Sequence, residues 1–122
     1  MKLGLILYAK NLKALTDFYT DTFHFEYMDG DETYARLLDQ GIELVILQSA
    51  PEFADVSTEP RTLVPMKPVF FMPYTLAEMR VSIFDNGGFF KPQEAEWEFE
   101  GHFVCDGHDI EGNIFQIRTP FK

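Results

Sequence analysis

A short segment near the C-terminus contains the side chains best suited to hold a metal ion. His102, Asp106, His108 and Asp109 lie close together in the chain, and zinc accepts both imidazole nitrogen and carboxylate oxygen as ligands. Strand alternation places His102 and Asp106 on one side, whereas His108 is expected in a turn. The spacing therefore argues against a metal ion at this cluster.

Glu43 is a single carboxylate within an otherwise apolar segment, and it is the one candidate catalytic residue. On a strand it would share a face with Val45. If that face lines a cleft, Glu43 could act as a general base or hold a cation. If it lies at the rim of a sheet, Glu43 is an ordinary solvated side chain. The sequence leaves both interpretations open.

Residues 94–100 alternate acidic and apolar side chains. A period of two places four glutamates on one face and Ala95, Trp97 and Phe99 on the other. This pattern is typical of a half-buried edge strand whose acidic face discourages pairing with another chain. Alternatively, Trp97 and Phe99 form an aromatic wall that stacks on a flat ligand, while the carboxylates attract its positive charge.

The elements that would position these residues follow one order twice. In the first half, residues 3–8 read as an apolar strand, Asn11 as a helix N-cap and residues 12–23 as a helix. Further strands are predicted at 25–29, 34–38 and 42–48. In the second half, a strand is predicted at 69–72, a helix from Thr75 to about residue 86, and strands near 89–90, 95–99 or on to 105, and 114–118. This order predicts a duplicated module, joined by a proline-containing linker at 49–67.

Composition narrows the class of protein. The 122 residues, 46% of them hydrophobic, suffice for one compact domain. A formal net charge of −10 argues against nucleic acid as a partner. No apolar run is long enough to span a bilayer, which argues against a membrane partner, and the single Cys105 suits a reducing compartment. We therefore expect a cytoplasmic protein.

Two motifs resemble a known family. Residues 7–12 followed by Phe18 and Tyr19, and the segment at 109–117, are similar to the glyoxalase, bleomycin-resistance and extradiol-dioxygenase proteins, the vicinal oxygen chelate superfamily. The Asp-x-x-Gly-Asn turn at 109–113 is the more specific motif, and we interpret it as structural, because Asp109 can bond the backbone two residues on and Gly112 can adopt positive φ.

The resemblance implies an α+β fold in which two βαβββ modules form a curved mixed sheet around a cleft. One domain would cover residues 1–122, with modules at 1–48 and 68–122 and the linker at 49–67. A homodimer is expected, because members of the family usually pair with a second chain.

The resemblance also implies where a metal ion would bind. The four ligand positions of the family fall on Gly4, Val45, Pro68 and Gln116. Among these only Gln116 offers an oxygen, too few for a catalytic metal site. We therefore expect no metal and no cofactor, which elemental analysis of the purified protein would test.

Strand alternation from those four positions gives the residues expected to line the cleft. Phe71, on the opposite face, is expected in the core. The ligand-binding candidates, taken together with the aromatic wall, are Tyr8, Glu43, Leu47, Phe70, Met72, Trp97, Phe99, Gln116 and Arg118.

Three functions remain in competition. The first is a metal-free protein that binds or sequesters a small molecule, such as a cationic or aromatic drug or antibiotic. The second is a lyase, isomerase or dioxygenase of the glyoxalase kind with a non-standard metal or acid/base site. The third is an interaction module that has lost its ligand. Loss of the metal ligands, acidity and aromatic content favour the first.

Overall fold

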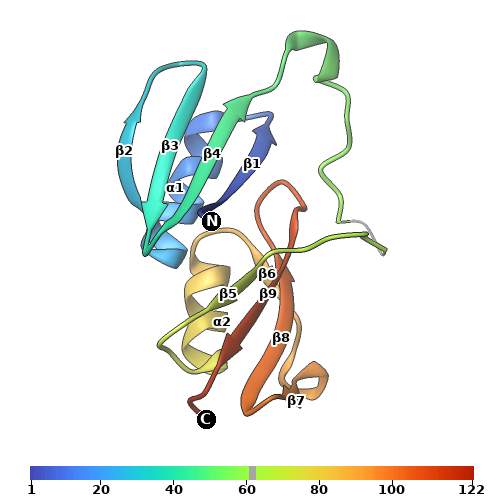
Figure 1. Ribbon diagram of the computed structural model, residues 1–122. Helices are drawn as coiled ribbons and strands as arrows, with labels where there is room; N and C mark the ends of the chain where they lie inside the picture. The colour runs from blue at the N-terminus through green and yellow to red at the C-terminus, as the bar shows by residue number, and fades with distance from the viewer. Residues whose placement is uncertain (61–62) are drawn as a thin grey trace. The chain divides into compact units, whose positions relative to one another are not determined.

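A computed structural model describes residues 1–60 and 63–122, which divide into two compact units, Met1–Ser57 and Thr58–Lys122. Each unit contains one helix and one mixed sheet (Figure 1). Arg61 and Thr62, which belong to the predicted linker, lie outside the described residues. The described part of that linker contains one short 3-10 turn, η1 (Pro51–Phe53).

The first unit has the predicted order of strand, helix and three strands. Its sheet has the order β1-β4-β3-β2, in which β1 and β4 are parallel and the other pairs antiparallel. A parallel pair needs a long crossover connection, and α1 provides part of it. The elements are β1 (Leu3–Ala9), α1 (Leu12–Phe23), β2 (Glu26–Gly30), β3 (Tyr34–Asp39) and β4 (Ile42–Gln48).

Helix α1 begins at the N-cap that the sequence predicts. The Asn11 side chain accepts a hydrogen bond of 3.1 Å from the Ala14 amide, and the Gln48 side chain accepts one of 3.1 Å from the Leu12 amide. Both bonds satisfy amides that have no partner within the helix. The apolar face of α1 packs against β3 and β4, where Leu37 and Ile46 are fully buried.

The second unit repeats the βαβββ order with one interruption. Its sheet has the order β5-β9-β8-β6, and β7 also pairs with β8. Strands β6 and β7 are therefore two pieces of one edge, separated by the 3-10 turn η2 (Gln93–Ala95). The elements are β5 (Val69–Phe71), α2 (Leu76–Asp85), β6 (Phe89–Phe90), β7 (Trp97–Phe99), β8 (His102–His108) and β9 (Ile114–Thr119).

The predicted acidic strand is shorter than its alternation suggested. Ala95 belongs to η2, and β7 ends at Phe99 because Glu100 and Gly101 turn the chain with φ of 49° and 77°. The strand therefore does not continue to Cys105, which lies in β8.

Helix α2 starts and stops where its sequence signals place it. The Thr75 hydroxyl accepts a hydrogen bond of 3.1 Å from the Glu78 amide. At the other end Gly87 has φ of 89°, and the Gly88 amide donates to the Ile83 carbonyl at 2.9 Å, which closes the last turn. Within the described residues, no helix is long and apolar enough to cross a membrane.

Candidate functional site

The sheet of the first unit turns one face toward α1 and leaves the other open. Leu44 and Ile46 face the helix and are buried, whereas Tyr8 is largely exposed and pairs in register with Leu47. Glu43 has the same parity as Leu47 on β4, so it lies on the same open face. The three ligand-binding candidates of this unit, Tyr8, Glu43 and Leu47, therefore share one face of the sheet.

Glu43 forms an ion pair with a lysine of its own unit. Its carboxylate accepts a hydrogen bond of 3.1 Å from the Lys2 ammonium group, which is more than half exposed. A general base must lie within hydrogen-bond reach of the proton that it removes. The Glu43 carboxylate is instead bonded to a largely exposed lysine, so this geometry favours the rim interpretation of Glu43.

A polar cluster on the same face was missed by sequence reasoning. Asp29 accepts hydrogen bonds from the Tyr34 hydroxyl at 2.9 Å and from two nitrogens of Arg36 at 3.0 and 2.6 Å. These bonds, that from Arg36 first, hold the pKa of Asp29 below its ordinary value and stabilise its charged form. The strand pair of β2 and β3 changes register between Tyr27 and Asp29, which periodicity alone does not reveal.

The open face of the second unit carries four of the nine predicted ligand residues, namely Trp97, Phe99, Gln116 and Arg118. Trp97, Val104, Arg118 and Phe71 stand in register across β7, β8, β9 and β5. Residues that pair in register on neighbouring strands lie on the same face of the sheet. Trp97 is 41% exposed and Phe71 is 63% exposed, so the face presents aromatic rings to its surroundings.

Arg118 lies at the centre of this aromatic face. Its guanidinium carbon is 4.7 Å from the centre of the Phe99 ring and 5.9 Å from that of Phe71. Both distances lie within the range of a cation–π contact. The described residues form no ring contact with Trp97. The face therefore has two rings, Phe71 and Phe99, that contact the Arg118 guanidinium, and a third ring, Trp97, that makes no ring contact with the described residues.

Two successive hydrogen bonds hold the Arg118 side chain in place. Arg118 Nε donates to Gln116 Oε1 at 2.8 Å, and Gln116 Nε2 donates to Asp106 Oδ1 at 3.1 Å. The other oxygen of Asp106 pairs with the Lys67 ammonium group at 2.6 Å. Gln116 is thus bonded at both ends of its amide, which makes it a positioning residue for Arg118.

The predicted orientation of β5 is wrong. Phe70 and Met72 were expected in the cleft, but both are buried, and Phe70 is in register with the core residue Ile117. Phe71, expected in the core, is exposed. The parallel pairing matches Val69, and not Pro68, with Gln116. A register error of one residue reverses every side chain of a strand.

The histidines near the C-terminus do not form a metal site. His108 belongs to β8, not to a turn, and stacks on Phe89 with ring centres 5.2 Å apart. His102 makes an edge contact of 5.4 Å with the ring of Phe71. In residues 1–60 and 63–122, no three His, Cys, Asp or Glu side chains come together as a group that could hold a metal ion.

The carboxylates of residues 94–100 do not line the aromatic face as a group. Glu96 pairs with Arg80 at 2.5 Å, on a part of the chain where both side chains are mostly buried. Glu98 is in register with Phe103 on β8, and so lies on the opposite face from Trp97.

Cys105 is buried, and burial raises the pKa of its thiol, which suits a packed side chain.

Comparison with known proteins identifies the fold. No protein-family model matches the chain, and no curated protein sequence matches it. A glyoxalase/bleomycin resistance protein/dioxygenase family enzyme from Burkholderia phytofirmans PsJN is 14% identical, with a TM-score of 0.76 over 97% of each chain. A glyoxalase-related enzyme from Fulvimarina pelagi is 15% identical, with a TM-score of 0.74 over 98% of this chain and 87% of the other.

A third solved structure is the fosfomycin resistance protein FosX from Listeria monocytogenes. It is 18% identical, with a TM-score of 0.72 over 95% of this chain and 89% of that protein. The chain therefore has the fold of the vicinal oxygen chelate superfamily, and the resemblance seen in the sequence is confirmed at the level of fold.

Proposed function

We propose that the protein binds a flat aromatic small molecule, without a metal ion, on the open face of the second sheet, and sequesters it without chemical conversion. Drug-like compounds with a cationic group are included in the proposal, since the whole chain is strongly acidic. The observation that carries the proposal is the row of Trp97, Arg118 and Phe71 across one exposed sheet face.

The lining of that face suits recognition better than catalysis. Aromatic rings supply a large contact area at little cost in side-chain freedom, and a fixed Arg118 orients a polar substituent. The positions at which the family carries metal ligands are mostly filled by side chains without a lone pair, such as Gly4 and Val45. One structural neighbour, FosX, is a fosfomycin resistance protein, which adds support for a drug as the bound compound.

The proposal also covers the assembly and location of the protein. Residues 1–122 would act as one cytoplasmic domain, in keeping with a likeness to the Burkholderia structure that spans 97% of both chains. The domain would pair with a second copy.

Ligand binding is expected to depend on Trp97. Flat aromatic compounds of matched size with positive, neutral and negative charge should quench Trp97 fluorescence saturably, and at least one should bind more tightly than about 1 mM. Trp97→Ala should weaken calorimetric binding of that compound about tenfold, because a stacking contact of about 1 kcal/mol and some buried area are lost. Addition of a metal chelator should leave the affinity unchanged.

Two variants separate this outcome from loss of structure. Trp97→Phe keeps a ring at the site and should retain most of the affinity. Val81→Ala, at an exposed position of helix α2, should behave as the wild type. Binding that requires added zinc, or Trp97→Ala binding as tightly as the wild type, would contradict the proposal.

A homodimer is the expected state in solution. The edge strand β1 exposes Ile6 and Tyr8, which are 60% and 68% accessible. Exposed apolar side chains of this size are commonly covered by a partner. Light scattering at micromolar concentration should give twice the chain mass of 14.1 kDa. A mass equal to one chain would exclude the dimer.

A further inference from the structure

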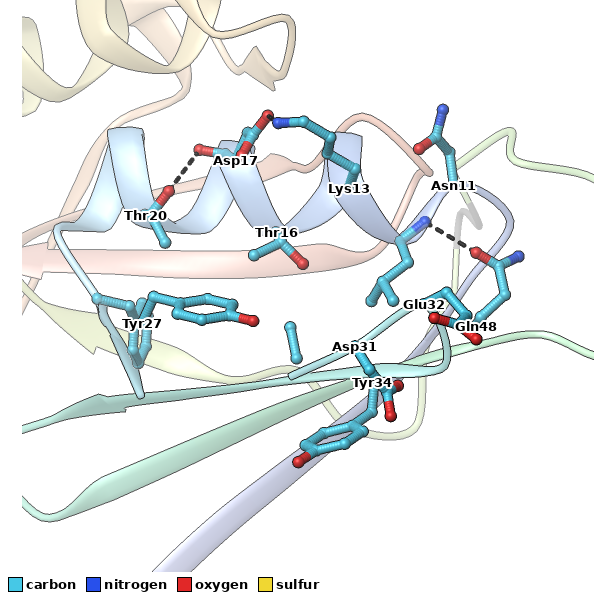
Figure 2. A pocket seen from close by; sticks show the side chains of 13 residues that line it. Asn11, Lys13, Thr16, Asp17, Thr20, Tyr27, Asp31, Glu32, Tyr34 and Gln48 are labelled. Atoms are coloured by element: carbon cyan, nitrogen blue, oxygen red, sulfur yellow. Dashed lines mark hydrogen bonds and ion pairs between the residues drawn. The ribbon is translucent and has the colours of Figure 1, made fainter. Parts of the chain in front are cut away.

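A pocket of about 690 Å³ lies in the first unit, on the side of the sheet that carries the helix. It is formed by α1, by the hairpin of β2 and β3 and by Gln48 at the end of β4. Figure 2 shows Thr16 and Tyr27 projecting into the space between helix and hairpin, with Asp31 and Glu32 from the hairpin turn. The apolar part of the lining comes from Leu12, Phe25 and Ala35.

The charged side chains of the pocket are mostly negative. Lys13 is the one cation among the lining residues, and it already forms an ion pair of 2.7 Å with Asp17. Asp31 accepts bonds from the Thr33 hydroxyl at 2.6 Å and the Thr33 amide at 2.7 Å. These neutral donors hold the pKa of Asp31 below its ordinary value, so the carboxylate keeps its charge. Asp31 and Glu32 thus place two carboxylates at one end of the pocket, and neither forms an ion pair with another described residue.

The N-terminus of α1 does not reverse this preference. Its positive end could attract an anion. However, the Leu12 amide is bonded to Gln48 and the Ala14 amide to Asn11. These donors are therefore not available to a ligand.

The Thr16 hydroxyl is a second, independent observation that indicates a ligand site in this pocket. The residue is 8% exposed, and its hydroxyl oxygen has no hydrogen-bond partner among residues 1–60 and 63–122. A buried hydroxyl without a partner is unfavourable, because it has given up its hydrogen bonds to water. Thr22 shares this property on the same helix, but only Thr16 lines the pocket. A ligand that donates a hydrogen bond to Thr16 would remove the cost.

We propose that this pocket binds a primary alkylammonium ion. The alkyl chain packs on Leu12, Phe25 and Ala35, the ammonium group donates a hydrogen bond to Thr16, and Asp31 and Glu32 supply the attraction for its charge. The ring of Tyr27 adds a cation–π contact. The site is separate from the aromatic face of the second unit, so it does not rest on the function proposed above.

The test uses three probes of one shape: pentylammonium, pentan-1-ol and hexanoate. Titrations of the ¹⁵N-labelled full chain, followed by the amide resonances of residues 11–35, should give saturable shifts with pentylammonium at about 1 mM. The alcohol and the acid should bind at least tenfold more weakly. Equal binding of the three probes, or no saturation by pentylammonium, would overturn the proposal.

Paired variants locate the contacts. Thr16→Val should weaken pentylammonium binding about fivefold, whereas Thr22→Val, which also removes a buried hydroxyl, should leave it unchanged. Glu32→Gln should weaken binding about fivefold, and Glu26→Gln, outside the pocket, should have no effect. If Thr16→Val does not fold, the glutamate pair decides: equal affinities of Glu32→Gln and Glu26→Gln would contradict the proposal.

Discussion

Replacement of Asp109 by alanine is expected to lower the free energy of unfolding of the second unit by about 3 kcal/mol. Asp109 is fully buried, and its carboxylate accepts bonds from the amides of Glu111 at 2.8 Å and Asn113 at 3.0 Å. The Asn113 side chain adds bonds of 3.2 and 2.9 Å. Alanine would leave these donors without their acceptor in a turn that precedes β9.

Urea denaturation followed by Trp97 fluorescence measures this change, because Trp97 lies in the same unit. Asp109→Asn is the matched variant. It keeps one oxygen for the two backbone amides, and it should cost less than the alanine variant. An alanine variant within about 0.5 kcal/mol of the wild type would show that the turn forms without the carboxylate.

Gly107→Ala should destabilise the protein by about 3 kcal/mol or prevent folding. Gly107 lies in β8, and a methyl group there would approach the Phe89 carbonyl oxygen to 2.4 Å and the Phe90 ring to 2.7 Å. The carbonyl belongs to the paired strand, so relief requires movement of the backbone. The expected cost is steric and not conformational, because the φ of Gly107 is not positive.

Gly4→Ala is the control for the loss of a strand glycine. A methyl group at Gly4 would have its nearest neighbour, the Glu43 carbonyl oxygen, at an ordinary distance of 3.5 Å. Its stability should equal or slightly exceed that of the wild type, since glycine is unfavourable in strands. Denaturation of both variants followed by far-ultraviolet circular dichroism makes the comparison. Equal stabilities would mean that β8 and β6 separate easily.

The sequence predicted the fold well because local signals and periodicity agreed with the tertiary structure. The caps at Asn11 and Thr75 and the glycine stop at Gly87 are local features, and each is observed. The turn at Asp109 and Gly112 also has the geometry expected of it, with φ of 82° at the glycine. Such features depend on few neighbours, so one sequence is enough to find them.

The candidate site was harder to predict, because it depends on register. Strand β5 contains three apolar residues in succession, so no alternation shows which of Phe70 and Phe71 faces the core. The pairing with β9 decides this, and it was misjudged by one residue. The pocket beside α1 escaped notice for a similar reason, since helix packing brings together residues from α1 and the β2–β3 hairpin.

The parallel pairing of the outer strands in each unit has a consequence for the order of folding during synthesis. The first sheet can be completed once Gln48 has been made, because β4 then pairs with β1. The second sheet cannot be completed until β9 exists, because β5 pairs with β9 and with no other described strand. Until then, the apolar side of β5 and α2 lacks its main cover. Nascent chains should therefore hold a finished first unit beside an exposed second one, which is the stage at which a chaperone would act.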